Sequence, residues 1–221
     1  MLGKVGGDAG LSPRGLQYAK CLADYVNGTL NESNDLTLWT SCLKRTIQTA
    51  RGIRTPQEQL AELNELDSGV CEGMSYEEIA DRFPVEFAAR DQDKFNYRYP
   101  GGESYLDLLR RVQPVLLRLQ KLGNVLVIAH QAVLRCLIGA LLNVENKELP
   151  YINAPLHTIM RMVCSSDGYR LELIPLSIEC VDTNRLKPAV IILSRVHQSI
   201  GIFISSMVYS FFFRACYLMF S

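Results

Sequence analysis

The sequence predicts an α/β fold, a three-layer sandwich in which helices flank a mainly parallel central sheet. Three observations support this prediction. Amphipathic helical segments alternate with short β-prone segments over residues 12–142. The run 124–129 is continuous and apolar, as in a strand that is buried on both faces. Two further β-prone stretches, 157–163 and 169–178, are joined by a turn and close the order.

Capping residues mark where two helices begin. Ser12 and Pro13 place an N-cap serine before a proline at the first helical position, and apolar residues then recur every three to four positions as far as Val26. Ser75 and Glu78 form the pattern of a capping box. We therefore expect a helix directly after each serine.

The remaining elements follow from local pattern. The alternating stretch 36–39 is β-prone and precedes a helical stretch over 43–52. A short helix and then irregular chain are expected within 56–74. Amphipathic spacing predicts a helix over 103–120, and a second apolar helix over 132–142 follows the buried strand.

Charge and cysteine content exclude several classes of protein. Twenty-three basic residues balance 23 acidic ones, so the basic excess of a general nucleic-acid binder is missing. Seven scattered cysteines without a Cys-x-x-Cys pair favour reduced thiols, and with them a cytoplasmic location. Three histidines without Cys/His spacing give no support for a zinc site, and we expect neither a metal nor a cofactor.

The composition changes near Pro188. Residues 188–221 contain only two arginines and no acid, which divides the chain into a domain at 1–188 and an apolar extension at 189–221. The 18 uncharged residues 196–213 just reach the length of a membrane span, although a histidine, a glutamine and four serines count against one. A non-native extension, a marginal anchor and a helix packed on the domain stay open as interpretations.

Two cationic junctions lie where predicted strands end, which is where ligands bind in open α/β sheets. The first strand leads into a helix whose first turn holds Arg45. The buried strand leads into His130 and Gln131, with Arg135 one turn further along the same helical face. Free N–H groups, the helix dipole and a guanidinium together favour a bound anion. The pair of junctions predicts a phosphate site, with solvated arginines as the alternative.

Two other features are ambiguous by themselves. Arg90 and Lys94 would share a face if their segment were helical, and the acids between them favour a solvated surface. Glu65 would be able to donate a proton if it were buried beside the anion, where its pKa would rise; a surface glutamate is the alternative. The residue pattern alone therefore predicts an α/β domain that binds a phosphorylated small molecule.

Six segments together resemble the fructose-2,6-bisphosphatase domain of the bifunctional 6-phosphofructo-2-kinase/fructose-2,6-bisphosphatase enzymes, within the histidine phosphatase (phosphoglycerate mutase-like) superfamily. The resemblance covers roughly residues 3–188, and the segment at 90–105 separates this subfamily from general mutases. The segments are 6–12 (GGDAGLS), 39–50 (WTSCLKRTIQTA), 63–72 (LNELDSGVCE), 90–105 (RDQDKFNYRYPGGESY), 125–136 (VLVIAHQAVLRC) and 149–158 (LPYINAPLHT).

The resemblance implies a mechanism and a role for each matched residue. In this family a histidine attacks the 2-phosphate of fructose 2,6-bisphosphate, and water then hydrolyses the phosphohistidine, which leaves fructose 6-phosphate. Arg45 and His130 would hold the 2-phosphate, and Glu65 would protonate the leaving oxygen and then activate the water. Substrate binding is implied for Gly6 and, around the 6-phosphate, for Tyr76, Arg90, Lys94, Tyr105, Gln131 and Arg135.

The sequence also departs from the family. The nucleophile of the family lies in an Arg-His-Gly motif at the end of the first strand, and this motif does not occur in the chain, whose first histidine is His130. The nucleotide-binding loop of the kinase domain does not occur either. We therefore expect a truncated domain without its first strand, and no turnover.

Function and partners follow as expectations. The chain is a fructose-2,6-bisphosphate 2-phosphatase by resemblance; the alternative is a non-catalytic module that binds a sugar phosphate or regulates a full-length enzyme. A phosphoglycerate mutase is disfavoured, because a three-carbon acid needs no distant second phosphate site. The expected ligands are fructose 2,6-bisphosphate and fructose 6-phosphate, without nucleic acid. The full-length family would form a homodimer through its kinase domain.

Overall fold

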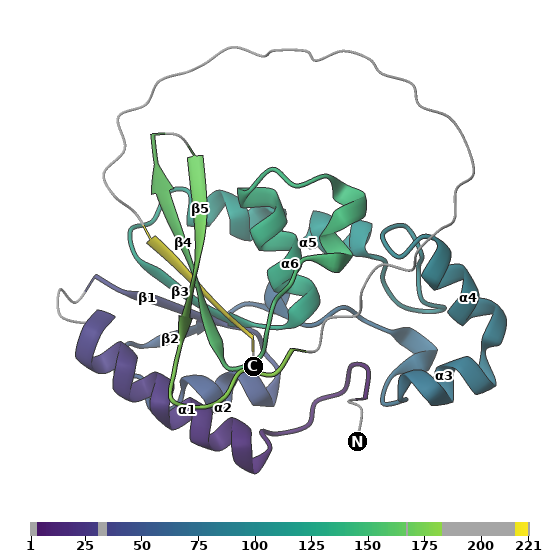
Figure 1. Ribbon diagram of the computed structural model, residues 1–221, viewed down its shortest axis with the longest axis horizontal. Coiled ribbons are helices and arrows are strands. Elements are labelled where there is room, and N and C mark those ends of the chain that lie inside the picture. The colour runs from purple at the N-terminus through teal and green to yellow at the C-terminus, as the bar shows by residue number, and fades with distance from the viewer. Residues whose placement is uncertain (1–3, 31–34, 167, 183–214, 221) are drawn as a thin grey trace.

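A computed structural model describes residues 4–30, 35–166, 168–182 and 215–220 (Figure 1). Its centre is a six-stranded sheet with the strand order β2-β1-β3-β6-β4-β5. The first four strands in this order run parallel, and β4 is antiparallel to both of its neighbours. The strands are β1 (Thr37–Thr40), β2 (Gln57–Gln59), β3 (Val125–Ala129), β4 (Thr158–Ser165), β5 (Gly168–Pro175) and β6 (Ala215–Phe220).

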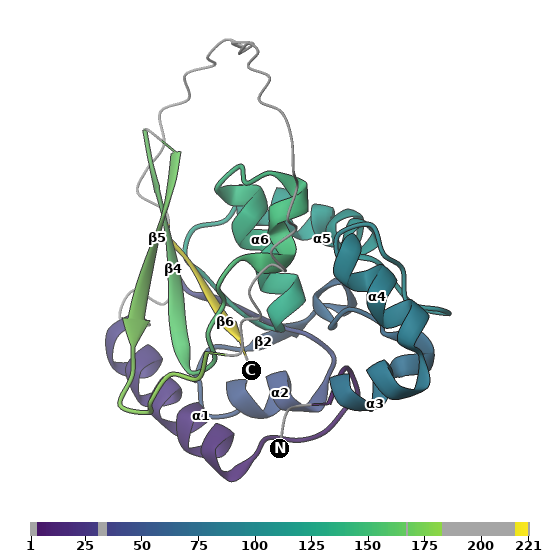
Figure 2. The same cartoon turned by 45° about the vertical axis from the view of Figure 1, so that its right-hand side comes forward.

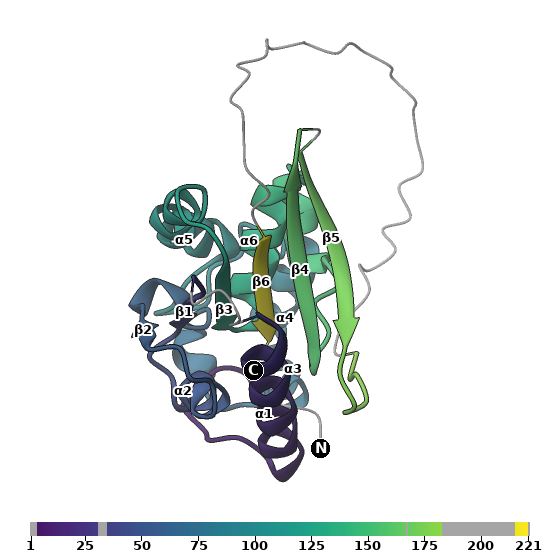
Figure 3. The ribbon, with the colours of Figure 1, turned by 90° about the vertical axis from the view of Figure 1, so that its left-hand side faces the viewer.

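Helices cover both faces of this sheet, which confirms the predicted α/β sandwich (Figures 2 and 3). Leu126 and Ile128 of β3 pack with α1 on one face, whereas Val127 packs with α5 and α6 on the other. Because both faces of β3 are buried, successive side chains must all be apolar, and this continuous apolar run is the pattern that predicted the strand. The helices are α1 (Pro13–Tyr25), α2 (Lys44–Ala50), α3 (Tyr76–Arg82), α4 (Pro84–Gln92), α5 (Tyr105–Leu119) and α6 (Gln131–Leu141).

Both predicted helix starts are confirmed. The side chain of Ser12 accepts a hydrogen bond from the amide of Gly15, with Pro13 in the first turn of α1. Ser75 and Glu78 form the reciprocal bonds of a capping box at α3. A second capping box, formed by Ser104 and Asp107, starts α5 and was not predicted.

The structure corrects the expected short helix within 56–74. That segment begins with the edge strand β2 and continues as two 3₁₀ turns, Ala61–Leu63 and Gly69–Cys71. The strand forms because Leu38 to Thr40 of β1 offer a free parallel edge, a tertiary cause that local pattern does not contain.

The central position of the sheet is filled by β6, which pairs in parallel with β3 and antiparallel with β4 (Figure 3). Tyr217, Leu218 and Met219 are buried there. No described residue before α1 forms a strand, as expected, but β6 satisfies the backbone groups that β3 and β4 would otherwise leave open.

The end of the extension is therefore a strand rather than a packed helix. The run at 196–213 lies outside the described residues, and so does the predicted boundary at residue 188, which stays a prediction. Among the helices of the described segments, none has the length and apolar character needed to cross a membrane.

Candidate functional site

The two junctions that the sequence singles out meet at one edge of the sheet. His130 follows β3 and is fully buried, and its Nδ1 lies 3.1 Å from Nε of Arg45 in α2. Its Nε2 lies 2.8 Å from the hydroxyl of Ser41, which directly follows β1. An arginine Nε is always a donor, so Nδ1 accepts and the imidazole hydrogen is on Nε2. The predicted convergence of Arg45 and His130 is thus found.

Of the two residues His130 and Arg45, only Arg45 is positively charged near pH 7. Burial lowers the pKa of His130 well below its usual value, and the charges of Arg45 and Arg111 lower it further. The imidazole is therefore neutral near pH 7. Burial also lowers the pKa of Arg45, while Glu65, Asp8 and Glu72 oppose that shift. Because free guanidinium groups titrate far above neutrality, Arg45 carries the positive charge of the pair.

The segment around Gly7 lies against Arg45. Nη1 of Arg45 donates to the carbonyl of Gly7 at 2.7 Å. The amide of Gly7 donates to the carboxylate of Glu72. Gly6 has a φ of +65°, a conformation that favours glycine, and a Cβ at that position would displace the Glu72 carboxylate. Asp8 accepts from the amide of Lys44 at 2.7 Å, which holds the segment to the start of α2.

Glu65 lies between two cations, in the loop that follows the turn Ala61–Leu63. Its Oε1 accepts from the amide of Leu66 at 2.9 Å, and the amide of Ala132 in the first turn of α6 also bonds the carboxyl group. Desolvation raises the pKa of Glu65, whereas these amides and the charges of Arg45 and Arg135 lower it; the net direction is upward. A carboxyl group in this setting is suited to donate a proton.

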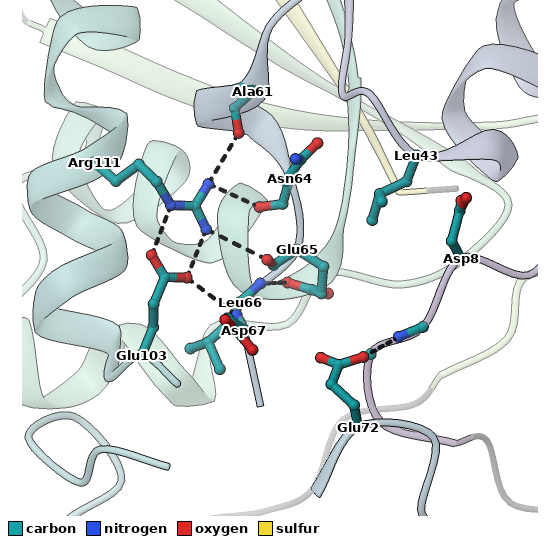
Figure 4. Close-up of a pocket in the computed structure, with 12 residues that line it drawn as sticks. Asp8, Leu43, Ala61, Asn64, Glu65, Leu66, Asp67, Glu72, Glu103 and Arg111 are labelled. Carbon is teal, nitrogen blue, oxygen red and sulfur yellow. Dashed lines mark hydrogen bonds and ion pairs between the residues drawn. The ribbon is translucent and has the colours of Figure 1, made fainter. Parts of the chain in front are cut away.

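A cavity of about 530 Å³ opens beside Glu65 (Figure 4). It abuts the Arg45–His130 pair through Gly7, whose carbonyl Arg45 contacts. Carboxylates dominate its polar lining, and a carboxylate accepts hydrogen bonds from hydroxyl groups. The lining residues are Gly6, Gly7, Asp8, Leu43, Ala61, Asn64, Glu65, Leu66, Asp67, Glu72, Glu103 and Arg111.

A second cationic cluster surrounds Arg90 at the end of α4. The guanidinium is buried; Nε donates to the hydroxyl of Tyr99 at 2.8 Å and Nη2 to that of Tyr76 at 3.2 Å. Asp91 pairs with Nη1 at 3.2 Å. Burial opposes the charge of Arg90, but the two tyrosines outweigh it and raise the pKa of the guanidinium. Arg90 is therefore a buried cation rather than the solvated one that the acids around it favoured.

A third group gathers on the segment 150–154. Arg135 is buried, and its guanidinium donates to the carbonyl of Ile152 at 2.8 Å and to the hydroxyl of Tyr105 at 3.2 Å. Gln131 donates to the carbonyl of Ala154 at 3.3 Å. Tyr105 also raises the pKa of Arg90, so it interacts with both arginines.

Lys94 reaches the same segment from another direction. Its ammonium lies 3.1 Å from the carbonyl of Pro150 and 5.0 Å from the ring centre of Tyr151. Because α4 ends at Gln92, the helical condition under which Lys94 would share a face with Arg90 is not met. Within the described chain, no cluster of three or more metal-ligating side chains occurs.

Sequence reasoning missed Ser41, Glu72, Glu103 and Arg111. Ser41 carried a usable signal, since it directly follows β1 at the carboxyl edge of the sheet. Arg111 carried none: it contacts Glu103, eight positions earlier, and the backbone of residues 61–65, and no local spacing encodes such contacts.

Comparison with known proteins gives a consistent picture. Residues 3–176 match the profile of the family described as "Histidine phosphatase superfamily (branch 1)". The chain is 51% identical over 195 residues to a 6-phosphofructo-2-kinase/fructose-2,6-bisphosphatase of Aquarana catesbeiana, covering 88% of this chain and 41% of that protein. It is 50% identical over 193 residues to the human "6-phosphofructo-2-kinase/fructose-2,6-bisphosphatase 4", with 87% and 41% covered. The chain thus spans about two fifths of these relatives.

Solved structures of more distant proteins share the fold. A putative alpha-ribazole-5'-P phosphatase from Escherichia coli superposes with a TM-score of 0.68 at 22% identity, covering 78% of this chain and 88% of the other. A mycobacterial glucosyl-3-phosphoglycerate phosphatase in complex with inorganic phosphate gives a TM-score of 0.62 at 21% identity, with 79% and 89% covered. At these identities the likeness establishes the architecture alone.

Proposed function

Because the chain belongs to the histidine phosphatase superfamily (branch 1), we propose that its cationic site binds fructose 2,6-bisphosphate as the substrate-binding part of a fructose-2,6-bisphosphate 2-phosphatase. The observation that carries this proposal is the position of Glu65, which lies within reach of the charges of both Arg45 and Arg135. A carboxyl group near two cations suits a ligand that carries a phosphate on either side of the oxygen to be protonated.

The 2-phosphate would bind at Arg45. The guanidinium of Arg45 supplies a fixed positive charge, and a charge-assisted hydrogen bond to a phosphate oxygen is among the stronger polar contacts in proteins. His130 is neutral and donates from Nε2, which the hydroxyl of Ser41 accepts at 2.8 Å. A phosphate that takes the place of this hydroxyl would receive the same hydrogen bond. Neither residue needs to gain or lose a proton for binding.

Glu65 would act on the bond between C2 oxygen and phosphorus. Its raised pKa keeps a proton available at a higher pH than an ordinary glutamate would, so it can protonate the departing sugar oxygen. After that transfer the carboxylate is stabilised by the amides of Leu66 and Ala132 and by the two arginines. The same carboxylate can then accept a proton from a water molecule.

The 6-phosphate would bind at the second and third clusters. Arg90 and Arg135 are both buried, and Tyr105 interacts with both of them. Two buried guanidinium groups that share Tyr105 as a neighbour favour a dianion, because a phosphate would bring two negative charges to buried cations. The residues that the resemblance assigned to the 6-phosphate would then all serve to bind it. The set for the 6-phosphate is Tyr76, Arg90, Lys94, Tyr105, Gln131 and Arg135, and Gly6 stays a predicted substrate contact through its backbone.

Binding without turnover is proposed for the 221-residue chain. The sequence contains no Arg-His-Gly. Both ring nitrogens of His130 are engaged by Arg45 and Ser41. His157 lies against the ring of Tyr18 in α1, with centroids 4.9 Å apart, rather than beside Arg45. Loss of a nucleophile costs several orders of magnitude in rate. This favours the alternative of a non-catalytic sugar-phosphate-binding module for the chain as it stands.

Calorimetric titration tests this function. We expect fructose 2,6-bisphosphate to bind more tightly than fructose 6-phosphate, and 3-phosphoglycerate to bind more weakly than either. Incubation with the 2-³²P-labelled bisphosphate should leave the protein unlabelled. Equal affinity for all three compounds would contradict the proposed bisphosphate site, and a labelled histidine would contradict binding without turnover. A cytoplasmic location and a dimer through a kinase domain remain predictions from the resemblance.

A further inference from the structure

Arg111 in α5 bonds the backbone of the loop that carries Glu65 (Figure 4). Its Nη1 donates to the carbonyl oxygens of Glu62 at 2.8 Å and Asn64 at 3.0 Å, and lies 3.4 Å from that of Ala61. Its Nη2 lies 3.3 Å from the carbonyl of Glu65 itself. One planar guanidinium thus holds four carbonyl groups within five consecutive residues.

Glu103 fixes the other side of the same guanidinium. Its two oxygens accept from Nε and Nη2 of Arg111, each at 2.8 Å. The carboxylate of Glu103 also accepts from the amide of Asp67 at 3.1 Å, and the amide of Glu103 donates to the carbonyl of Asp67 at 2.8 Å. Arg111 and Glu103 therefore form hydrogen bonds with the loop backbone both before and after Glu65.

These hydrogen bonds matter because the loop around Glu65 contains no helix or strand. The 3₁₀ turn Ala61–Leu63 ends two residues before Glu65, and the next turn begins at Gly69. Between them the backbone makes few local hydrogen bonds, so side chains must set its path. A guanidinium is suited to this task, because its five N–H groups are arranged in a rigid fork.

We propose that Arg111 is a positioning residue for Glu65: it fixes the loop so that the Glu65 carboxyl stays on the amides of Leu66 and Ala132, between Arg45 and Arg135. This inference deepens the proposed function and rests on it for its relevance to catalysis. Neither the expected phosphate contacts nor the proton transfer is assigned to Arg111. It acts through the backbone.

Arg111 acts on Glu65 through the backbone of the loop and not through its own charge, because other groups face the Glu65 carboxyl. Arg45 of α2 and Arg135 of α6 face its carboxyl group and lower its pKa, and Tyr105 of α5 and Cys136 of α6 also interact with it. The charge of Arg111 is compensated by Glu103 in a bidentate pair. A lysine at position 111 would keep that charge but lose the planar fork, so Arg111→Lys distinguishes geometry from charge.

Amide proton shifts report the position of the Glu65 carboxyl directly. In ¹⁵N-labelled protein without ligand, the amide protons of Leu66 and Ala132 should both move with pH as Glu65 titrates, because both bond its carboxyl group. Glu65→Gln should abolish both movements, which assigns them. In Arg111→Gln, the movement at Ala132 should be lost while the rest of the spectrum keeps the dispersion of a folded protein.

Two further variants keep the test decisive. Arg111→Lys should reduce the Ala132 movement although the charge is retained; it also replaces Arg111→Gln if that variant does not fold. Arg118→Gln is the matched control, since Arg118 lies on the same helix and pairs with Glu58 of β2. It should leave both movements unchanged. Unaltered titration of Ala132 in both Arg111 variants would overturn the proposal.

The outcome is separate from that of the proposed function. The titration uses protein without ligand, whereas the function is tested by calorimetry with fructose 2,6-bisphosphate. If the wild-type chain does not bind the bisphosphate but Ala132 depends on Arg111, the positioning role stands and the function falls. If the bisphosphate binds and Ala132 does not depend on Arg111, the function stands and the positioning role falls.

Discussion

Nε of Arg45 donates a hydrogen bond to Nδ1 of His130 across 3.1 Å, and this contact joins the ends of two parallel strands into one site. Because the arginine can only donate, the contact also fixes which imidazole nitrogen carries the hydrogen. His130 is held neutral by burial and by its cationic neighbours. The stability of the protein should therefore depend on pH through this residue.

The first prediction concerns that dependence. His130 has an ordinary pKa near 6.5 in the unfolded chain and a much lower pKa when folded. Below pH 6.5 the unfolded state binds more protons, so stability falls as pH falls, by up to about 1.4 kcal/mol per pH unit. His130→Asn should remove this contribution. Urea unfolding at pH 7.0 and 5.5 should show a smaller loss for the variant than for the wild type, and equal losses would contradict the assignment.

The second prediction concerns Glu65 and has the opposite sign. Its folded pKa is raised above 4.5, so the folded state holds a proton that the unfolded state has released. The stability contribution is complete below pH 4.5 and is lost as pH rises through the folded pKa. Glu65→Gln should therefore gain stability relative to the wild type between pH 4.5 and pH 7. Glu62→Gln, in the turn before the loop, is the control. If the difference in unfolding free energy between Glu65→Gln and the wild type were the same at pH 4.5 and pH 7, the raised pKa of Glu65 would be refuted.

The third prediction separates the two phosphate sites. Arg90→Gln removes a cation expected at the 6-phosphate, and a charge-assisted hydrogen bond contributes about 2 kcal/mol. The affinities for fructose 2,6-bisphosphate and for fructose 6-phosphate should both fall roughly 30-fold. Arg45→Gln should weaken the bisphosphate to a similar extent but leave fructose 6-phosphate unchanged. Calorimetry with both ligands checks this, and loss of both ligands in Arg45→Gln would show that the sites are not separate.

Part of the site could be predicted because one local rule determines it. The carboxyl ends of parallel strands meet at one sheet edge, so Arg45 and His130 converge once β1 and β3 are neighbours in the sheet. The buried strand and the helix starts were likewise predictable from periodicity and capping. For Tyr76 and Tyr105 the residue pattern gave no role, and only the resemblance pointed to them.

Other features depend on contacts that no window of sequence contains. Arg111 was missed because its partners are backbone carbonyls some fifty positions earlier. Whether Lys94 continues the helix of Arg90 could not be decided from the sequence, because the end of α4 at Gln92 has no glycine to mark it. The strand β6 was missed because a run of six apolar residues suits a buried strand or a buried helix equally well. Its identity is set by the slot between β3 and β4.

The last prediction tests the position of β6 between β3 and β4 by substituting two leucines. Leu218 of β6 and Leu173 of β5 are both register partners of Met160, on opposite sides of β4. Leu218 is fully buried, whereas Leu173 is 54% exposed. Leu218→Ala should therefore destabilise the protein by about 2–5 kcal/mol in urea unfolding, as expected for a buried leucine. Leu173→Ala should change stability by less than about 1 kcal/mol.

The comparison is decisive because the two substitutions are chemically identical and share a neighbour. If β6 fills the centre of the sheet, removing the Leu218 side chain leaves a cavity on the face of the sheet that packs with α5 and α6, and the folded state cannot close it without moving β3 or β4. If β6 does not pair with these strands, Leu218 has no buried surface to lose. The two variants would then unfold at the same urea concentration, and the central position of β6 would be refuted.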